Sequence, residues 1–165
     1  MPFYRFEFKA NVPITTAIER LRAMAGPAPT FGESIQRAFG GDPRAFPPFI
    51  GSVEGREFHL RRDIRYRNSF LPRISGQVEA AAGGCRVSGT MTIHPLVGGF
   101  MALWFSMLAM GMINGFHGVK GEDAGWPLVP AGMFLFGIAL CIGGFMPEAI
   151  KARRLLENGI AEGAT

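Results

Sequence analysis

Two long uncharged runs in the C-terminal half constrain this chain more than any other feature. The first, residues 96–116, reads LVGGFMALWFSMLAMGMINGF, and the second, residues 126–146, reads WPLVPAGMFLFGIALCIGGFM. Each run has 21 residues, and a helix needs about 20 apolar residues to cross the hydrocarbon core of a bilayer. A domain this small cannot enclose two helices that are apolar on every side. We therefore expect a transmembrane helical hairpin over residues 96–146.

The link between the runs, residues 117–125, is too short to hold a domain, so the two helices must be antiparallel. Lys and Arg lie on both outer flanks, with Arg73 and Arg86 before the first run and a cluster after the second. By the positive-inside rule both termini are then cytoplasmic. The N-terminus shows no cleavable signal peptide, and Arg outnumbers Lys, as is common in GC-rich bacteria. We expect a multi-pass protein of the bacterial plasma (inner) membrane.

The charged residues gather outside the runs and predict a three-part chain. Residues 1–95 hold 13 Lys and Arg and 8 Asp and Glu, whereas residues 126–147 hold no charge. We expect a cytoplasmic α+β domain over residues 1–95, the hairpin over 96–146, and a short cytoplasmic amphipathic tail over 147–165. In that tail Pro147 is expected to start a new helix at the membrane interface, with three cations facing the headgroups: Lys151, Arg153 and Arg154.

Alternating apolar and charged residues predict a small antiparallel sheet with one or two helices in the first domain. The expected strands are residues 4–9, 49–54, 57–67, 74–81 and 85–94, with polar and apolar side chains on opposite faces. A helix over residues 13–25 has an apolar stripe, and capping-box spacing at Thr30 predicts a second over 31–39. The fold class is therefore α+β, followed by the two-helix hairpin.

Five arginines within thirteen residues form the strongest candidate site. They are Arg61, Arg62, Arg65, Arg67 and Arg73, and Asp63 is the only acid among them. Alternation over 57–67 places Arg61, Arg65 and Arg67 on one strand face. Contact with anionic headgroups, to which each cation contributes about 1 kcal/mol, is one interpretation. A solvated face partly paired with Glu57, Asp63 and Glu79 is the second, and an anionic ligand or protein partner is the third.

Arg62 does not fit the alternation, because it falls on the apolar face of the expected strand. Either a bulge or strand end redirects the side chain, or Arg62 lines a polar pocket. Asn68 is interpreted as a turn residue.

Small residues at four-residue spacing in the two runs predict close helix packing. The residues are Gly98, Ala102, Ser106, Gly111, Gly115, Gly137 and Gly143. Packing within the hairpin, formation of a homo-oligomer and docking on a larger membrane complex all agree with this pattern.

The motifs of known chemistries are missing. There is no Gly-rich phosphate loop, no carboxylate or His inside the runs that would suit a proton-coupled transporter, and no aromatic platform for nucleic acid. His59 and Asp63 would be about 13 Å apart on one strand, which is beyond hydrogen-bond reach. We expect no cofactor, no metal and no nucleic acid partner.

One segment resembles a known group of proteins. The stretch Tyr66–Pro72, the later Gly76 and His94-Pro95 leading into the first run are similar to small bacterial two-span membrane proteins of unknown function. The resemblance covers roughly residues 48–115 and implies the same architecture, a short β domain on a two-helix anchor, and no particular activity.

Together these features predict a membrane-anchored, non-enzymatic binding or accessory protein whose basic domain lies near the inner leaflet. The alternative is a membrane-interface enzyme that acts on a lipid or another anionic amphiphile. A small oligomeric pore is disfavoured, because the runs lack a polar lining.

Overall fold

The computed structural model describes residues 3–27, 30, 32, 47–64, 66–118 and 128–162. The second helix expected over residues 31–39, the link between the runs and Arg65 lie largely or wholly outside these ranges. The elements follow one another as β1 (Phe3–Ala10), α1 (Ile14–Met24), β2 (Ala25–Gly26), β3 (Phe49–Glu54), β4 (Glu57–Arg62), β5 (Arg73–Ala81), β6 (Gly84–Thr92), α3 (Pro95–Gly118) and α4 (Leu128–Glu162).

The strands form a single sheet in the order β1-β6-β5-β4-β3-β2. Neighbouring strands are antiparallel except for β2, a two-residue strand parallel to β3 that the sequence pattern did not predict. The predicted alternation in β1 is confirmed, because Phe6 and Phe8 are buried and their neighbours are not. The α+β class, with a mostly antiparallel sheet, is therefore confirmed.

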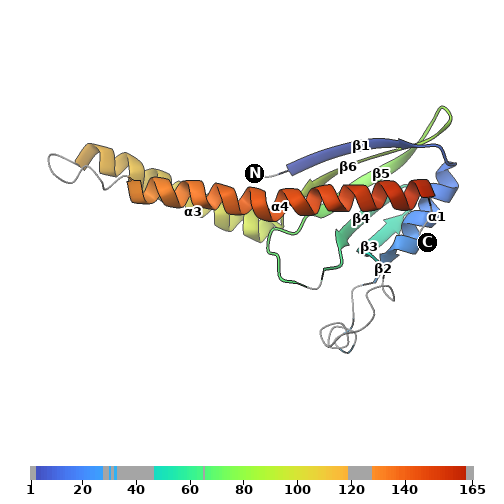
Figure 1. Ribbon diagram of the computed structural model, residues 1–165, viewed down its shortest axis with the longest axis horizontal. Coiled ribbons are helices and arrows are strands. Elements are labelled where there is room, and N and C mark those ends of the chain that lie inside the picture. Colours follow the sequence, from blue (N-terminus) through green and yellow to red (C-terminus); the bar gives the residue numbers. More distant parts are fainter. Residues whose placement is uncertain are drawn as a thin grey trace.

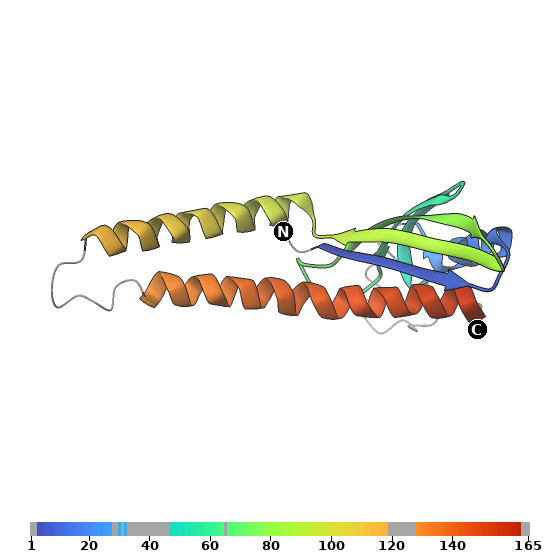
Figure 2. The ribbon, with the colours of Figure 1, turned by 90° about the horizontal axis from the view of Figure 1, so that it is seen from above.

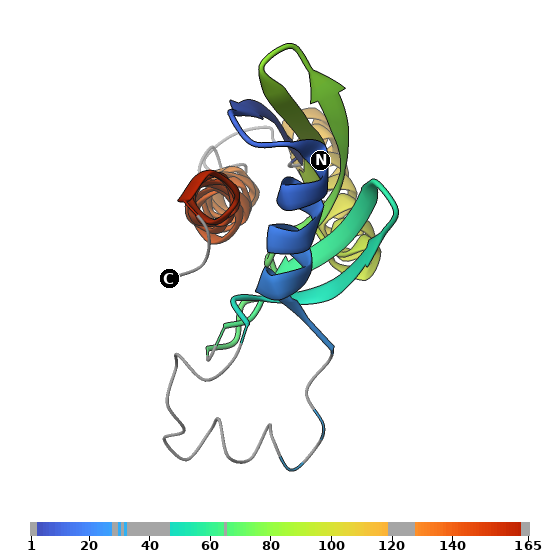
Figure 3. The same cartoon turned by 90° about the vertical axis from the view of Figure 1, so that its right-hand side faces the viewer.

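One side of the sheet is covered by α1 and by the C-terminal half of α4, which lie next to each other (Figure 3). The helices contribute fully buried residues to a common core with the sheet. From α1 and α4 these are Ala17, Leu21, Ala149, Ala152, Leu156 and Ile160. The core of the α+β domain therefore uses α4 and is not complete within residues 1–95.

Beyond the sheet, α3 and α4 run side by side as a long hairpin (Figures 1 and 2). The apolar stretch of α3, Pro95–Asn114, has a mean hydropathy of 1.9, and the most apolar window of α4 reaches 2.1. Only 6% and 17% of these windows are buried. Side chains such as Leu103, Met107 and Leu135 are more than 60% exposed, so the protein itself does not shield them from water. Both helices are long and apolar enough to cross a membrane.

The structure differs from the sequence prediction at Pro147. No new helix begins there, since α4 is one helix of 35 residues with Pro147 inside it. Proline in a helix interior costs about 3 kcal/mol, but the buried residues that follow it, from Glu148 to Ile160, hold the second half of α4 against the domain. Arg20 of α1 also donates to the carbonyl oxygens of Ile160 and Ala161 at 2.6 and 2.9 Å, which satisfies the C-terminal end of α4.

A second difference concerns the strand predicted over residues 57–67. β4 ends at Arg62, so Arg67 lies in the connection to β5 and not on a strand face. The reason is tertiary, because this connection leaves the sheet to contact α4. Asn68 donates to the carbonyl oxygen of Gly144 at 2.9 Å, a contact between residues 76 positions apart in the chain.

Candidate functional site

The open side of the sheet carries its polar side chains in rows that the strand register defines. Arg61 of β4 lies opposite Arg73 of β5, and Arg73 lies opposite Thr92 of β6. Both arginines are exposed and alternate with the buried Leu60 and Ile74, so they point away from the helices. This proximal row lies beside the apolar hairpin, because α3 begins only three residues after Thr92.

The two arginines of the proximal row have no acidic partner among the residues that the structure describes. They border a shallow hollow of about 430 Å³. Its lining comes from three neighbouring strands and comprises Ile50, Gly51, His59, Leu60, Arg61, Arg73, Ile74 and Ser75. Like charges directly opposite each other on adjacent strands repel, so the hollow is a place where an anion would be stabilised.

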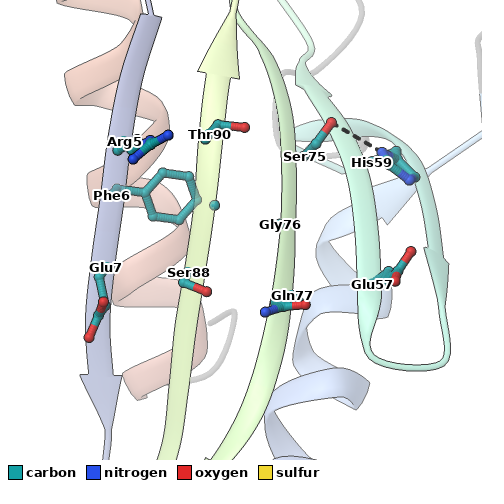
Figure 4. Close-up of a pocket in the computed structure, with 11 residues that line it drawn as sticks. Arg5, Phe6, Glu7, Glu57, His59, Ser75, Gly76, Gln77, Ser88 and Thr90 are labelled. Atoms are coloured by element: carbon teal, nitrogen blue, oxygen red, sulfur yellow. Dashed lines mark hydrogen bonds between the residues drawn. The ribbon is translucent and has the colours of Figure 1, made fainter.

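The next row, one pleat further from α3, contains a histidine–serine pair. Nδ1 of His59 lies 3.1 Å from the hydroxyl oxygen of Ser75, and both side chains are exposed (Figure 4). The sequence prediction considered only Asp63 as a companion for His59 and missed Ser75. The signal for Ser75 was absent from the local pattern, because the two residues meet only through the register of β4 with β5.

Acidic residues mark the third row. Glu7 of β1 and Glu57 of β4 lie on either side of Ser88 and Gln77, at the far end of a trough of about 590 Å³ (Figure 4). Rows on one face of a strand repeat about every 7 Å. The open face therefore carries cations near α3 and two carboxylates about 14 Å further along the strands. One of these carboxylates, Glu7, lies 3.5 Å from the guanidinium of Arg86.

Of the other two members of the predicted arginine face, the structure describes only Arg67. Arg67 is exposed in the β4–β5 connection, and Arg65 is not among the described residues. Among the described residues no ion pair joins an arginine to Glu79, one of the acids named in the second interpretation. The Glu79 carboxylate accepts a hydrogen bond from Gln77 at 2.9 Å. Among the described residues of the predicted cluster, Arg61 and Arg73 are the two that the strand register brings together.

Arg62 belongs to a separate, partly buried cluster at the junction of the sheet and the hairpin. Its guanidinium donates to one carboxylate oxygen of Glu148, and the hydroxyl of Tyr66 donates to the other. The Glu148 side chain is only 4% exposed, and the ammonium group of Lys151 lies 3.6 Å from its carboxylate. Of the two sequence interpretations, the strand end is the one found, because β4 ends at Arg62 and the side chain is directed to Glu148.

The hydrogen bond to Glu148 raises the pKa of Tyr66 above its ordinary value of 10.0, and burial adds to the shift. A phenol that donates to a carboxylate is stabilised in its neutral form. Glu148 was missed by the sequence reasoning, although a lone carboxylate directly after an uncharged run was a signal that could have found it.

Two neighbouring residues, Asn68 and Phe70, also contact α4 at the junction of the sheet and the hairpin. The side-chain oxygen of Asn68 accepts from the backbone N–H of Phe70 at 2.9 Å, while its amide nitrogen reaches Gly144. The ring of Phe70 packs directly against Gly144. A Cβ added at Gly144 would lie only 2.8 Å from the nearest ring carbon of Phe70. Asn68 is therefore a turn residue, as predicted, and also a contact to α4.

The small residues of the hairpin fall into two groups. Gly98 and Gly137 are buried, and a Cβ on Gly137 would lie 2.9 Å from the ring of Phe105. Gly98 and Ala102 line an apolar hollow of about 360 Å³ between α3 and α4. Packing within the hairpin thus accounts for part of the predicted face.

Three of the others, Ser106, Gly111 and Gly143, are exposed. Ser106 is exposed and donates to the carbonyl oxygen of Ala102 at 2.8 Å. Open space surrounds Gly111 and Gly143, and Gly115 lies in the last turns of α3.

The cations of the predicted tail lie on the second half of α4. Lys151 contacts Glu148, as described above, and Arg154 is exposed. Arg153 donates to the hydroxyl of Tyr4 in β1 at 3.0 Å and lies 3.8 Å from Glu157. Arg153 is thus part of the domain, where it joins α4 to the edge of the sheet.

The described residues contain no group of three His, Cys, Asp or Glu side chains that could hold a metal ion. Cys85 and Cys141 are free and buried, and burial raises the pKa of the Cys85 thiol. Comparison with protein family models, with curated proteins and with solved structures finds no match for this chain.

Proposed function

We propose that this chain is a membrane-anchored, non-enzymatic binding or accessory protein, whose α+β domain stands in the cytoplasm on the inner leaflet. The observation that carries the proposal is the proximal row. Arg61 and Arg73 face outward at the end of the sheet from which α3 departs. At that level they meet the phosphates of the leaflet, and each cation near an anionic surface contributes about 1 kcal/mol.

The rigid mounting of the domain supports this role. α4 runs for about 50 Å from the apolar hairpin into the core of the domain without a break. β6 enters α3 through only two residues, Ile93 and His94. A domain attached at both points holds one face of its sheet at a constant height and angle above the bilayer, as a binding platform requires.

The cations next to the hairpin support the proposed orientation. Arg61, Arg73 and Lys151 are all exposed on the domain side, which the positive-inside rule assigns to the cytoplasm. The resemblance of residues 48–115 to small bacterial two-span proteins favours a bacterial plasma membrane. A reporter fused after Thr165 is expected to be active only in the cytoplasm, and activity outside would overturn the orientation.

An interfacial enzyme is the second candidate, and the contact of His59 with Ser75 is the observation that bears on it. A serine nucleophile needs a base that a third group orients. Among the described residues no carboxylate contacts His59. The pair therefore fits a donor in a binding site better than a nucleophile and its base.

Proximity to headgroups is the direct test of the proposed function. The experiment uses the full-length protein in a Cys85→Ala, Cys141→Ala background. One fluorescent label is attached to a new cysteine, either at Thr92→Cys in the proximal row or at Glu79→Cys, which lies about 20 Å from that row along the sheet. Bilayers contain a quencher lipid whose spin-labelled headgroup is either anionic or neutral. We expect strong quenching at position 92, more from the anionic lipid, and little at position 79. Equal quenching at both positions would contradict the proposal.

The contribution of the arginines is isolated by matched charge changes. Arg61→Gln with Arg73→Gln should abolish the preference for the anionic quencher, and added salt should weaken it in the unchanged protein. Lys9→Gln with Arg86→Gln removes the same charge from the distal end of the sheet and should have no effect. A preference that survives the first pair of substitutions would show that the proximal row does not contact lipid.

A further inference from the structure

The hollow between β3, β4 and β5 has the chemistry of a specific anion site. We propose that it binds a phosphomonoester group, held between the guanidinium groups of Arg61 and Arg73 with the His59–Ser75 pair as a further donor. This inference rests on the proposed function, since it concerns the same row of the sheet, and it names the chemical group that the row selects.

Charge and acceptor count favour a phosphomonoester. Two guanidinium groups face the hollow, and no described carboxylate pairs with them. A phosphomonoester carries about −1.5 to −2 charges at neutral pH and three terminal oxygens. Each guanidinium offers two parallel N–H donors, so two of them match three oxygens better than the two unesterified oxygens of a phosphodiester.

The opposed arginines also supply a driving force. Directly opposite residues on antiparallel strands have Cβ atoms about 5 Å apart, and like charges at that spacing destabilise the pair. A doubly charged anion between Arg61 and Arg73 turns this repulsion into two attractions. Both side chains are exposed, so they can close on a ligand without disturbing the core.

The next row contributes a donor whichever way its hydrogen bond runs. If the hydroxyl of Ser75 donates to Nδ1 of His59, then Nε2–H of the neutral ring remains free to donate. If Nδ1–H donates to Ser75 instead, the hydroxyl hydrogen remains free. In both cases one N–H or O–H group borders the hollow, about 7 Å from the arginine row.

The phosphomonoester group could come from two sources, a lipid headgroup at the membrane surface or a soluble phosphate compound. The test uses full-length protein in neutral nanodiscs, with the imidazole of His59 followed by NMR. The protein has only three histidines, and a His59→Gln sample assigns the signal. Three probes are titrated: inorganic phosphate from solution, phosphatidic acid in the disc as a lipid phosphomonoester, and phosphatidylglycerol as a lipid phosphodiester.

We expect phosphatidic acid to shift the His59 signal to saturation at a surface density about tenfold lower than phosphatidylglycerol requires. A response to phosphatidic acid without one to inorganic phosphate assigns the group to a lipid. A saturable response to inorganic phosphate assigns it to a soluble compound as well. Equal responses to the two lipids, with none to inorganic phosphate, overturn the site but leave the proposed function to the quenching experiment.

A conservative variant separates the effect of the paired N–H donors of arginine from the effect of its charge. Arg61→Lys with Arg73→Lys keeps both charges but loses the bidentate donors. It should weaken the phosphatidic acid response about tenfold while retaining the anionic preference in the quenching experiment. If the lysine variant responds like the unchanged protein, the proximal row is only a general basic surface. Lys9→Gln with Arg86→Gln is the control, and its response should not change.

Discussion

The guanidinium of Arg62, the last residue of β4, donates to the buried carboxylate of Glu148, the first residue after Pro147 in α4. The two residues are 86 positions apart, and their contact joins the sheet to the helix at the point where the helix leaves its apolar stretch. Buried ion pairs specify geometry more than they add stability. We infer that this one sets the height and rotation of α4 against the sheet.

Removing the acid should open the domain. Glu148→Gln leaves the partly buried charge of Arg62 uncompensated, which should lower the free energy of unfolding by about 3–5 kcal/mol. Cys85, in the core, reports this opening, because a thiol reagent reaches it only when the domain unfolds. In a Cys141→Ala background we expect the labelling of Cys85 to accelerate at least a hundredfold.

Two control variants accompany this prediction. Arg62→Met with Glu148→Leu should restore most of the stability. Glu157→Gln, at an exposed ion pair, should change the free energy of unfolding by less than about 1 kcal/mol. An unchanged labelling rate in Glu148→Gln would contradict a structural role for the Arg62–Glu148 ion pair.

Tyr66 should titrate at high pH. Its pKa is raised above 10.0, chiefly by the hydrogen bond to Glu148. Because the folded pKa is the higher one, this interaction stabilises the fold fully below about pH 10, and its contribution disappears as the pH rises through the folded pKa. In Tyr4→Phe, Tyr66 is the only tyrosine, so tyrosinate absorbance follows it alone. We expect a midpoint above 10 that falls in Glu148→Gln, whereas a midpoint at or below 10 would disprove the contact.

Adjacent glycines in α4 offer a matched pair of substitutions. In Gly144→Ala the new methyl group meets the ring and Cβ of Phe70 at 2.8 and 3.1 Å. The displacement of the β4–β5 connection should cost about 1–3 kcal/mol by the Cys85 assay. Gly143→Ala meets nothing within 4 Å and should be neutral or slightly stabilising. Equal effects of the two substitutions would mean that Phe70 does not dock on α4.

Pro147 should be dispensable for the fold. The residue is exposed within a continuous helix, and alanine there restores a hydrogen bond to the carbonyl oxygen of Gly143. We expect Pro147→Ala to raise the free energy of unfolding by about 1–3 kcal/mol. A loss of stability would instead indicate that the domain needs a bend at this residue.

Local patterns predicted those elements whose own residue spacing marks a buried face or a short turn. The alternation in β1, the stripe in α1 and the hairpin of β5 with β6 depend on spacing alone, and they form close to their expected bounds. The helix break expected at Pro147 was wrong. The residues after Pro147 keep the helix continuous, because they are buried against a sheet that lies more than fifty residues away in the sequence.

The candidate site was predictable only in part. The arginines were visible in the sequence, but the end of β4 at Arg62 and the placement of Arg61 opposite Arg73 depend on contacts with α4 and on strand register. Alternation alone extended the strand to Arg67 and placed Arg67 on the same strand face as Arg61. In the structure β4 ends at Arg62, and Arg61 lies opposite Arg73. Glu148 completed the junction without any periodic signal of its own.

The central claim is that one helix connects the bilayer to the core of the domain, and a spin-label scan along α4 from Leu135 to Asn158 tests it most directly. Oxygen and a water-soluble nickel reagent report lipid and water exposure at each position. We predict one helical period that continues in phase through Pro147, with lipid exposure before Glu148 and buried positions at Ala149, Ala152 and Leu156. A break in phase after Pro147, followed by lipid exposure of those three positions, would contradict the account and restore the interfacial helix that the local sequence suggests.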